Sequence, residues 1–421
     1  MQYLKQCNIN FEDPLKKIAL QKMFVNSQVM LIYGAAGTGK TTLINYISNM
    51  MNQSKKLFLT KTHTALQNLK RHIDNPGLEA DFISIDSFTK SVTLTDYDII
   101  FIDECSTIDN RTMKKLLEKI DESTFLVLAG DVYQIESIDF GNWFYYAKDV
   151  VNTDGACVEL LNTWRTDKKE LKSLWEAVRR VEPIITEKLA MDGAFSADID
   201  KELFIAADDD EIVLCLNYDG KFGLNNMNLY FQNANTKSEA YSWAEWTFKV
   251  GDPVIFLDTK RSSLLYNNLK GRIVDISKNE STILFTLDID TVLTERQCRN
   301  ENFEFVDVTE YGTRIRLEVI RDDEESLSDE ERIKTIIPFQ IAYAVSIHKA
   351  QGLEYKSVKI IIPSSNAEKI SHSIFYTAIT RAKEKLKIYW SAETMASIIE
   401  SFSKDKAEQR SLPIIKKKLG L

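Results

Sequence analysis

The chain has 421 residues, of which 44% are hydrophobic and 27% are charged. This composition is typical of a soluble globular protein with two or three domains, and it excludes a disordered or fibrous chain. No apolar run reaches the roughly 18 residues of a membrane span, and the first residues lack the pattern of a secretory signal, so we expect a cytoplasmic protein.

The formal net charge is −9, which argues against nucleic acid as a partner because such binding depends on Lys and Arg side chains. The acidity is local, however. Residues 198–211 carry −6 and residues 321–332 carry −5, which leaves the rest of the chain at +2. We interpret both runs as solvated loops. A basic groove for nucleic acid is therefore permitted elsewhere, although composition alone does not demonstrate one.

The five cysteines are far apart in the sequence and form no CxxC pair. They are Cys7, Cys105, Cys157, Cys215 and Cys298. This spacing and the odd number predict neither a disulfide framework nor a zinc site. We expect reduced cysteines that serve as small apolar residues.

Short apolar runs alternate with helix-compatible stretches over most of the chain, which is the pattern of an α/β fold with parallel sheets. The runs are VMLIYG (29–34), KLFLT (56–60), DIIFIDE (98–104), FLVLAGD (125–131), IVLCLNY (212–218), VKIIIP (358–363) and LKIYW (386–390). Between residues 249 and 335 the strand-like runs are separated by turns, which predicts a small antiparallel barrel or sandwich. We therefore predict a first α/β domain over 1–156, a second over 157–248 and 336–421, and a β-rich insertion over 249–335.

The segment GAAGTGKTT (34–42) matches the phosphate-binding pattern G-x-x-x-x-G-K-[ST] between a predicted strand and a predicted helix. Its glycines let backbone N–H groups approach phosphate oxygens, and the start of the helix adds a favourable partial charge. Lys40 can pair with the β and γ oxygens, and the Thr41 hydroxyl can bind Mg²⁺. We therefore predict a site for ATP and Mg²⁺. Its nucleotide-binding residues are Gly34, Gly37, Thr38, Gly39, Lys40, Thr41 and Thr42.

Two further strand ends carry candidate catalytic side chains. Asp103 and Glu104 end the run DIIFIDE, at the edge where ligands of open α/β sheets bind. We expect Asp103 to hold Mg²⁺ and Glu104 to orient or deprotonate the attacking water. Gln134 lies one turn after the run FLVLAGD, where a neutral amide can sense the γ-phosphate. Together these elements predict hydrolysis rather than binding alone.

A P-loop domain by itself leaves a small-molecule kinase, a GTPase and an AAA-type subunit open, and two later arginines narrow the choice. Arg165 lies at the expected junction of the domains, and Arg381 lies just before the last strand. Donated to a γ-phosphate from a second domain, both would act as arginine fingers that stabilise the transition state only when the domains close. Domain closure and hydrolysis would then be coupled.

With these motifs in place, the chain resembles superfamily 1 helicases, and most of all their RecD-like branch (superfamily 1B). The matching segments follow the expected order: 34–41, 62–64, 103–104, 130–134, 164–165, 346–354 and 376–381. The resemblance covers most of both α/β domains. It implies two RecA-like domains with ATP between them, a single nucleic-acid strand across both, and an SH3-like or OB-like β-rich insertion in the second.

The resemblance also implies which residues contact each ligand. Gly352 and Glu354 would lie toward the nucleotide, and Trp164 would lie against the adenine ring. The residues expected to contact the strand are Thr62, His63, Thr64, Phe88, Ser346, His348 and Lys349. The alternatives are a helix cap for Thr62 or Thr64, a core position for Phe88 or Trp164, and a purely structural role for His348.

Two departures from the family pattern affect the expected function. The glutamine that reads adenine ahead of the P-loop in many relatives has no counterpart here, so the choice of ATP over other nucleotides stays open. The stretch between residues 87 and 98 is too short for the wedge hairpin of strand-separating relatives. Unwinding would then be weak, depend on a partner, or be replaced by translocation that strips proteins from the strand.

We predict an ATP-dependent translocase or helicase on single-stranded DNA that acts as a monomer, with 5′ to 3′ polarity taken from the resemblance alone. A protein partner in replication, repair or recombination is compatible with this interpretation. The alternative from another class is an ATP-regulated nucleic-acid-binding switch or remodelling ATPase without processive unwinding. RNA in place of DNA also stays open, because phosphate contacts do not distinguish the two.

Overall fold

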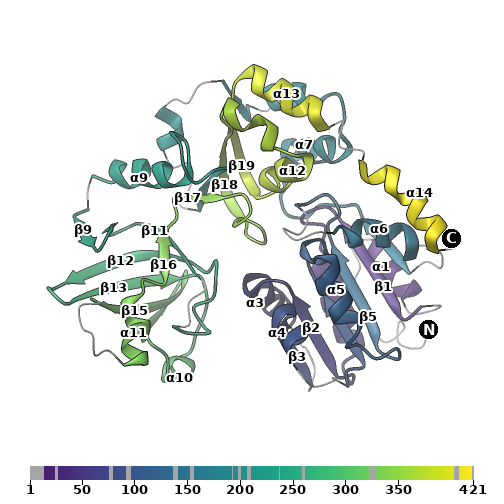
Figure 1. The fold of residues 1–421 in the computed structure, drawn as a ribbon, viewed down its shortest axis with the longest axis horizontal. Coiled ribbons are helices and arrows are strands. Elements are labelled where there is room, and N and C mark those ends of the chain that lie inside the picture. Colours follow the sequence, from purple (N-terminus) through teal and green to yellow (C-terminus); the bar gives the residue numbers. More distant parts are fainter. Residues whose placement is uncertain are drawn as a thin grey trace. The chain divides into compact units, whose positions relative to one another are not determined.

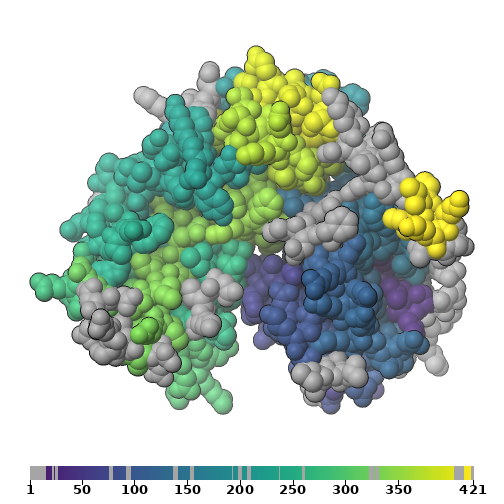
Figure 2. All heavy atoms as spheres, viewed as in Figure 1, coloured from purple at the N-terminus to yellow at the C-terminus, as the bar shows by residue number. Residues whose placement is uncertain are grey.

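The chain folds into two compact units, which are described here from a computed structural model (Figures 1 and 2). Unit 1 falls within Met1–Ala197, Gly352–Glu354 and Ser364–Leu421, and unit 2 falls within Asp198–Gln351 and Tyr355–Pro363. The structure describes residues 14–23, 27–74, 79–91, 96–135, 141–151, 156–191, 193–197, 201–205, 210–236, 238–257, 261–321, 328–402 and 407–419.

A six-stranded parallel sheet forms the centre of unit 1, with strand order β3-β2-β4-β5-β1-β6. Its strands are β1 (Val29–Gly34), β2 (Lys56–Thr60), β3 (Ala80–Ser84), β4 (Ile99–Ile102), β5 (Phe125–Gly130) and β6 (Cys157–Leu160). The central strands are buried along their whole length, as expected for a parallel sheet that is covered on both faces. Because all strands run the same way, their carboxyl ends gather at one edge.

Successive residues of these strands point to opposite faces and so enter two separate cores. Met30, Phe58 and Phe101 belong to one core, whereas Leu31, Leu57 and Ile100 belong to the other. The first core is completed by α1 (Pro14–Lys22), α2 (Lys40–Met50) and α3 (His63–His72). The second is completed by α4 (Ile85–Lys90), η2 (Cys105–Thr107), α5 (Asn110–Leu117) and α6 (Trp143–Val150) (Figure 1).

Unit 1 also contains segments that follow β6 and segments from the end of the chain. They are α7 (Lys169–Arg180), α8 (Ile185–Met191), β7 (Phe195–Ser196), η5 (Ser364–Lys369), α12 (His372–Ile379), β19 (Ala382–Tyr389), α13 (Ala392–Phe402) and α14 (Ala407–Leu419). Strand β19 pairs in parallel with β7, and the indole N–H of Trp175 on α7 donates to the Ile379 carbonyl at 3.1 Å. These contacts attach α12 to the part of the chain that follows the P-loop sheet.

Unit 2 combines a parallel strand set with an antiparallel sheet. Strand β8 (Glu211–Cys215) pairs in parallel with β17 (Ala344–Ser346) and with β18 (Tyr355–Ile361), and α9 (Leu224–Ala234) contacts β17. The remaining elements outside the second sheet are η4 (Lys201–Phe204), α10 (Glu295–Cys298), α11 (Asp329–Thr335) and the hairpin β9 (Ala240–Trp243) with β10 (Trp246–Lys249).

The antiparallel sheet has the order β14-β15-β13-β12-β11-β16. Its strands are β11 (Pro253–Phe256), β12 (Lys270–Lys278), β13 (Thr282–Ile289), β14 (Glu304–Thr309), β15 (Gly312–Ile320) and β16 (Phe339–Ile341). Burial alternates residue by residue along β13, which places one face on an aromatic-rich core around Phe248, Phe285 and Phe339. The guanidinium of buried Arg261 donates to the carbonyls of Asn302, Ile336 and Glu318, which fastens the loops of this sheet.

The predicted α/β class with parallel sheets is confirmed. The domain boundaries at residues 156, 248 and 335, and the SH3-like or OB-like nature of the insertion, stay predictions. No helix within the described ranges is long and apolar enough to cross a membrane. The four cysteines in the described ranges, Cys105, Cys157, Cys215 and Cys298, are free thiols.

Candidate nucleotide site

The P-loop lies between β1 and α2 at the carboxyl edge of the parallel sheet. Gly37 has a φ of 73°, a backbone conformation that L side chains rarely adopt. The Lys40 ammonium donates to the carbonyls of Gly34 and Ala35, at 2.9 Å each, so it lies back over the loop. Burial lowers the pKa of Lys40, while the nearby carboxylates of the site raise it. The loop thus places the Lys40 ammonium at the start of a helix, as phosphate binding requires.

Thr41 and Asp103 form the arrangement expected of a magnesium site. The Thr41 hydroxyl donates to Asp103 Oδ2 at 2.9 Å, and the Glu104 N–H donates to Asp103 Oδ1 at 2.8 Å. Asp103 is 7% exposed, so its carboxylate is held in place at the end of β4. A hydroxyl and a carboxylate are hard oxygen donors of the kind that Mg²⁺ takes alongside water and phosphate. The residues therefore fit this ion.

The electrostatics of Glu104 are compatible with its predicted role as a general base near neutral pH. Burial and the neighbouring Asp103 raise the pKa of Glu104 to about 7, against the lowering effects of Arg381, Lys40 and Arg165. Its backbone has a φ of 55°, in the left-handed region that non-glycine residues rarely occupy. Glu104 is the residue that caps the start of the short helix η2.

The segment after β5 connects the P-loop sheet to α12. Asp131 is 3% exposed; it accepts from the Gln134 side chain at 3.2 Å and from the Tyr133 N–H at 3.0 Å. Burial raises the pKa of Asp131, although Lys40 lowers it. The Ile135 N–H donates to Thr377 Oγ1 on α12 at 2.9 Å. Gln134 thus lies where the sensor role was predicted, and that role stays a prediction.

Arg165 packs directly on the P-loop. A Cβ built on Gly37 would lie 2.3 Å from Arg165 Cβ, so only glycine fits this contact. The Arg165 guanidinium contacts Glu354 at 2.5 Å and donates to the Thr380 carbonyl at 2.9 Å. Burial acts to raise the pKa of Glu354, but Arg165 and Lys383 outweigh it and hold the pKa at about 2. Arg165 is therefore held by a carboxylate at the place where an arginine finger is expected.

Arg381 is almost completely buried, with 2% of its surface exposed. It donates to the Thr377 carbonyl at 2.9 Å, to the Leu353 carbonyl at 3.2 Å and to the Thr380 hydroxyl at 3.3 Å. Burial and Arg165 lower the pKa of Arg381 to about 10, while nearby carboxylates, Glu354 first, raise it. Both predicted arginines thus lie in the same compact unit as the P-loop, and Arg381 has its donors directed at backbone carbonyls and a hydroxyl.

Gly352 brings two predicted motifs together. Its φ is 74°, and a Cβ added there would lie 3.4 Å from Glu104 Oε1. Its carbonyl accepts from the Asn68 side chain on α3 at 3.1 Å. Gly352 therefore lies between the Glu104 carboxylate and α3, the helix that begins after Thr62.

The contacts of this site that were not found from the sequence include those of Tyr376 and Asn68. The Tyr376 hydroxyl accepts from the N–H of Ala36 in the P-loop at 3.3 Å, and Tyr376 is only 1% exposed. Asn68 gave no signal in the sequence because a polar residue on an amphipathic helix is usually surface. Tyr376 lies inside the segment 376–381 that matches the family pattern, but no role was predicted for it from the sequence.

Trp164 is 50% exposed, so the alternative of a core tryptophan is wrong. The backbone N–H of Trp164 donates to the Gly37 carbonyl at 2.7 Å, which places the residue beside the P-loop. Contact with a nucleotide base stays a prediction for this side chain.

The strand-contact candidates in unit 1 differ in accessibility. Thr62 is exposed, and its hydroxyl accepts from the Ala65 N–H at 3.2 Å, so it is the predicted helix cap. His63 is exposed, whereas Thr64 is buried. Phe88 is 2% exposed and belongs to the second core of the sheet. Base stacking by Phe88 is therefore a wrong prediction, because a ring enclosed by core side chains presents no face to a base.

The candidates in unit 2 lie at the end of β17. The Ser346 hydroxyl accepts from the Lys349 N–H at 3.2 Å, which closes a turn that leaves His348 exposed. The Lys349 ammonium donates to Gln340 Oε1 at 2.9 Å, and burial lowers the pKa of Lys349. Strand contact by these residues stays a prediction.

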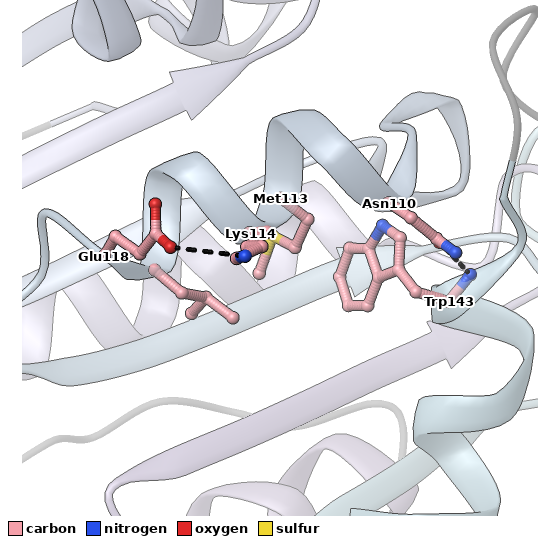
Figure 3. A pocket seen from close by; sticks show the side chains of 6 residues that line it. Asn110, Met113, Lys114, Glu118 and Trp143 are labelled. Carbon is pink, nitrogen blue, oxygen red and sulfur yellow. Dashed lines mark hydrogen bonds and ion pairs between the residues drawn. The ribbon is translucent and has the colours of Figure 1, made fainter. Parts of the chain in front are cut away.

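A pocket of unit 1 lies apart from the nucleotide residues (Figure 3). It is lined by Asn110, Met113, Lys114, Leu117, Glu118 and Trp143, from α5 and the start of α6. At one end of the pocket the backbone N–H of Trp143 donates to Asn110 Oδ1 at 3.2 Å. At the other end the Lys114 ammonium forms an ion pair with the Glu118 carboxylate at 3.7 Å. None of the predicted site residues lines this pocket.

Comparison with known proteins agrees with this geometry. Residues 16–197 match the AAA domain family, and residues 341–389 match the UvrD-like helicase C-terminal domain family. RecBCD enzyme subunit RecD of Buchnera aphidicola is 23% identical over 91% of this chain and 74% of its own length. The RecD subunit of Haemophilus influenzae is 24% identical over 90% of this chain and 70% of its own length.

Solved helicase structures share the fold. A structure of Pif1 helicases at forked DNA matches with a TM-score of 0.58 and 16% identity, over 96% of this chain and 97% of that one. Pif1 from Candida albicans matches with a TM-score of 0.56 and 15% identity, over 95% and 100% of the two chains. The fold and the site therefore define a nucleotide-binding P-loop ATPase of the helicase and translocase class. The two family matches and the RecD relatives support an ATP-hydrolysing helicase that resembles the RecD-like branch of superfamily 1.

Proposed function

We propose that the chain is an ATP-driven motor on single-stranded DNA that moves 5′ to 3′ and separates duplexes or displaces bound proteins. Its similarity to helicases supports movement on nucleic acid. DNA as the track is supported by a structure of similar fold, Pif1 from Bacteroides bound to single-stranded DNA, with a TM-score of 0.57 and 15% identity. We expect the motor to act as a monomer, with a protein partner in replication, repair or recombination.

The observation that carries this proposal is the chain of contacts from Asn68 through Gly352 to Glu104. Asn68 lies on α3, the helix whose first turn holds the candidate strand contacts. Its hydrogen bond to the Gly352 carbonyl ties that helix to the turn that lies against Glu104. A displacement of α3 on strand binding would therefore move Gly352 relative to the catalytic carboxylate. This is a direct physical route for coupling between strand and hydrolysis.

The chemistry at the nucleotide follows from the positions of the side chains. Lys40 would pair with the β and γ oxygens in place of its present carbonyl partners. Mg²⁺, held by Thr41 and Asp103, would neutralise charge on those oxygens. Glu104 would accept the proton of the attacking water. Arg165 would leave Glu354 for the γ-phosphate, which adds a second positive charge in the transition state.

The first experiment is steady-state ATP hydrolysis alone and with single-stranded DNA, single-stranded RNA or blunt duplex, at one low salt concentration. We expect strong stimulation by single-stranded DNA and little by the duplex. Lys40→Ala serves as the inactive reference and should retain a cooperative melt. Equal rates of ATP hydrolysis with all three nucleic acids would favour a protein-directed switch over the motor. Stronger stimulation by RNA would identify RNA rather than DNA as the nucleic acid on which the motor acts.

The second experiment tests the coupling contact. Asn68→Leu removes the hydrogen bond to Gly352 and should leave basal hydrolysis unchanged while lowering the stimulated rate by about tenfold, roughly 1.4 kcal/mol. Gln67→Leu makes the same change one residue earlier on α3 and should behave as the wild type. If Asn68→Leu keeps full stimulation, coupling does not pass through this contact.

A third experiment separates a motor from a binding switch. Duplexes with a 5′ tail or a 3′ tail, and tailed strands that carry a protein block, are incubated with ATP. We expect displacement from the substrates with a 5′ tail only. Nucleotide-dependent binding to the tails without release of strand or block would support the switch and overturn the motor.

A further inference from the structure

The Tyr376 hydroxyl on α12 contacts the P-loop as an acceptor only. It accepts from the Ala36 N–H at 3.3 Å, and 1% of the residue is exposed. A tyrosine hydroxyl can accept and donate at the same time, because its oxygen has lone pairs and its hydrogen is a donor. Within the part of the chain that the structure describes, no carbonyl or side chain accepts that hydrogen. The hydroxyl is therefore a buried donor that lacks its acceptor.

The ring that carries this hydroxyl is held in place from several sides. It meets the Tyr133 ring edge-on, with 6.2 Å between the centroids, and stacks on the His372 ring at 6.4 Å. The next residue, Thr377, accepts from the Ile135 N–H at 2.9 Å, which ties α12 to the segment after β5. A ring enclosed in this way cannot turn its hydroxyl toward bulk water. Since a buried donor without an acceptor costs free energy, a ligand that brings an acceptor to the loop would be bound more tightly.

The peptide group between Ala35 and Ala36 joins Tyr376 to the phosphate-binding lysine. Its N–H donates to the Tyr376 hydroxyl at 3.3 Å, and its carbonyl accepts from the Lys40 ammonium at 2.9 Å. Lys40 is predicted to pair with the β and γ oxygens. The guanidinium of Arg165, the residue predicted to face the γ-phosphate, acts electrostatically on both Lys40 and Tyr376. The hydroxyl therefore lies at the end of the loop where the terminal phosphate is expected.

A phosphate oxygen has the chemistry that this donor lacks. Terminal phosphate oxygens are negatively charged acceptors, and hydrogen bonds to such acceptors are about twice as strong as those between neutral groups. Burial raises the pKa of Tyr376 well above its usual value, and the neighbouring Asp131 adds to the rise. The hydroxyl therefore keeps its hydrogen throughout the physiological pH range and remains a donor.

From this placement we propose that the Tyr376 hydroxyl donates a hydrogen bond to the γ-phosphate and thereby favours nucleoside triphosphates over diphosphates. A diphosphate lacks the third phosphate group and would leave the hydrogen without its acceptor. The inference rests on the proposed function of the same site as an ATP site, and it adds a residue that recognises the third phosphate. Tyr376 is a binding residue here, whereas Lys40 contacts the β and γ oxygens together.

The test measures dissociation constants of a non-hydrolysable ATP analogue and of ADP, both with Mg²⁺, for the full chain without nucleic acid. Tyr376→Phe removes the hydroxyl and keeps the ring that packs against Tyr133. We expect the affinity for the ATP analogue to fall by about tenfold and the affinity for ADP to fall by less than about twofold. If both affinities fall by the same factor, Tyr376 only supports the P-loop and the proposal is overturned. It is also overturned if neither affinity changes.

Two control variants separate the hydroxyl from the packing around it. Tyr33→Phe makes the same change one residue before the P-loop, where the hydroxyl donates to Glu159 at 3.3 Å, and it should leave both affinities unchanged. Thr377→Val removes the bond between α12 and Ile135 but keeps the Tyr376 hydroxyl. It should keep the wild-type ratio of the two affinities. If Thr377→Val lowers this ratio as much as Tyr376→Phe does, the docking of α12 is responsible and the proposal is overturned.

The outcome is distinguishable from a failure of the proposed function. Because no strand is present, the absence of strand-stimulated hydrolysis would leave the comparison of the two nucleotides untouched. A wild type that binds neither nucleotide would overturn the ATP site and this inference together. A wild type that binds both nucleotides, combined with an unchanged ratio in Tyr376→Phe, would overturn this inference and leave the motor standing.

Discussion

The Arg165 guanidinium contacts the Glu354 carboxylate at 2.5 Å, while Lys383 holds the other oxygen of that carboxylate at 2.8 Å. The Arg165 side chain is 12% exposed and that of Glu354 is 34% exposed, so the pair lies at the margin of the interior. If Arg165 is the predicted arginine finger, it would have to turn from Glu354 toward the γ-phosphate. We therefore expect Glu354 to compete with the nucleotide for Arg165.

Glu354→Gln should weaken this competition and raise hydrolysis in the absence of nucleic acid by about fivefold, roughly 1 kcal/mol of coupling. Arg165→Ala should lower the rate, because the positive charge for the transition state is lost. In the double variant the effect of Glu354→Gln should disappear. The measurement is a double-mutant cycle on basal kcat, and additive effects of the two changes would contradict the competition.

The pKa of Glu104, about 7, predicts an acidic limb in the pH profile of hydrolysis. The base is ionised above that pH, so kcat/KM for ATP should fall about tenfold for each pH unit below it. Measurements of kcat/KM between pH 5.5 and pH 9, which extend roughly one and a half to two units on either side of this pKa, would show the acidic limb. A flat profile over that range would contradict the assignment of Glu104 as the base.

The same pKa predicts the effect of Glu104→Gln on folding. A carboxyl group whose pKa is raised on folding stabilises the protein below its unfolded pKa, and this stabilisation is lost as the pH rises through the folded value. Glu104→Gln cannot ionise, so at pH 8 it should be more stable than the wild type by on the order of 1 to 3 kcal/mol. Denaturant unfolding at pH 8 and at pH 5.5 measures this difference, which should shrink at the lower pH.

The Thr41 hydroxyl predicts how hydrolysis depends on magnesium. Thr41→Val keeps the shape of the side chain but removes the oxygen that bonds to Asp103. The Mg²⁺ concentration at half-maximal hydrolysis should rise by about tenfold or more, since one oxygen of the ion's surroundings is lost. Thr41→Ser retains the oxygen and should restore the wild-type titration. An unchanged magnesium titration in Thr41→Val would contradict the site.

The burial of Phe88 predicts a change in stability rather than in strand binding. Phe88→Ala should destabilise unit 1 by about 3 to 4 kcal/mol because it leaves a cavity in the core. Phe88→Leu should cost about 1 kcal/mol and leave the affinity for single-stranded DNA unchanged in the folded protein. Denaturant unfolding and strand-binding titrations of Phe88→Leu test both parts. A large loss of affinity for single-stranded DNA in a fully folded Phe88→Leu variant would support base stacking by Phe88 and contradict its assignment to the core.

The parts of the site that could be predicted from sequence are those whose geometry is local. Lys40, Thr41 and Asp103 each follow directly from a strand end or a helix start, and such geometry is set by a few neighbouring residues. Ile85 and Phe88 lie three residues apart on the short helix α4 and are both buried. That helical spacing is a signal for core that could have outweighed the base-stacking hypothesis for Phe88.

The contacts that could not be predicted join residues far apart in the chain. Nothing in the surroundings of Asn68 indicates that its amide meets Gly352, and nothing near Arg165 indicates Glu354 as its partner. Such pairings depend on how the elements pack, which one sequence without its structure does not reveal.

The return of the chain to the P-loop has a practical consequence for gene fragments. The AAA domain match ends at residue 197, which invites expression of the first 197 residues alone. That fragment would hold Lys40 and Asp103, but it would lack the Tyr376 hydroxyl that accepts from the P-loop N–H of Ala36, and it would lack Arg381. A fragment that keeps these contacts with the P-loop therefore has to include residue 381, and truncation from the carboxyl end would remove the contacts well before it removed the P-loop.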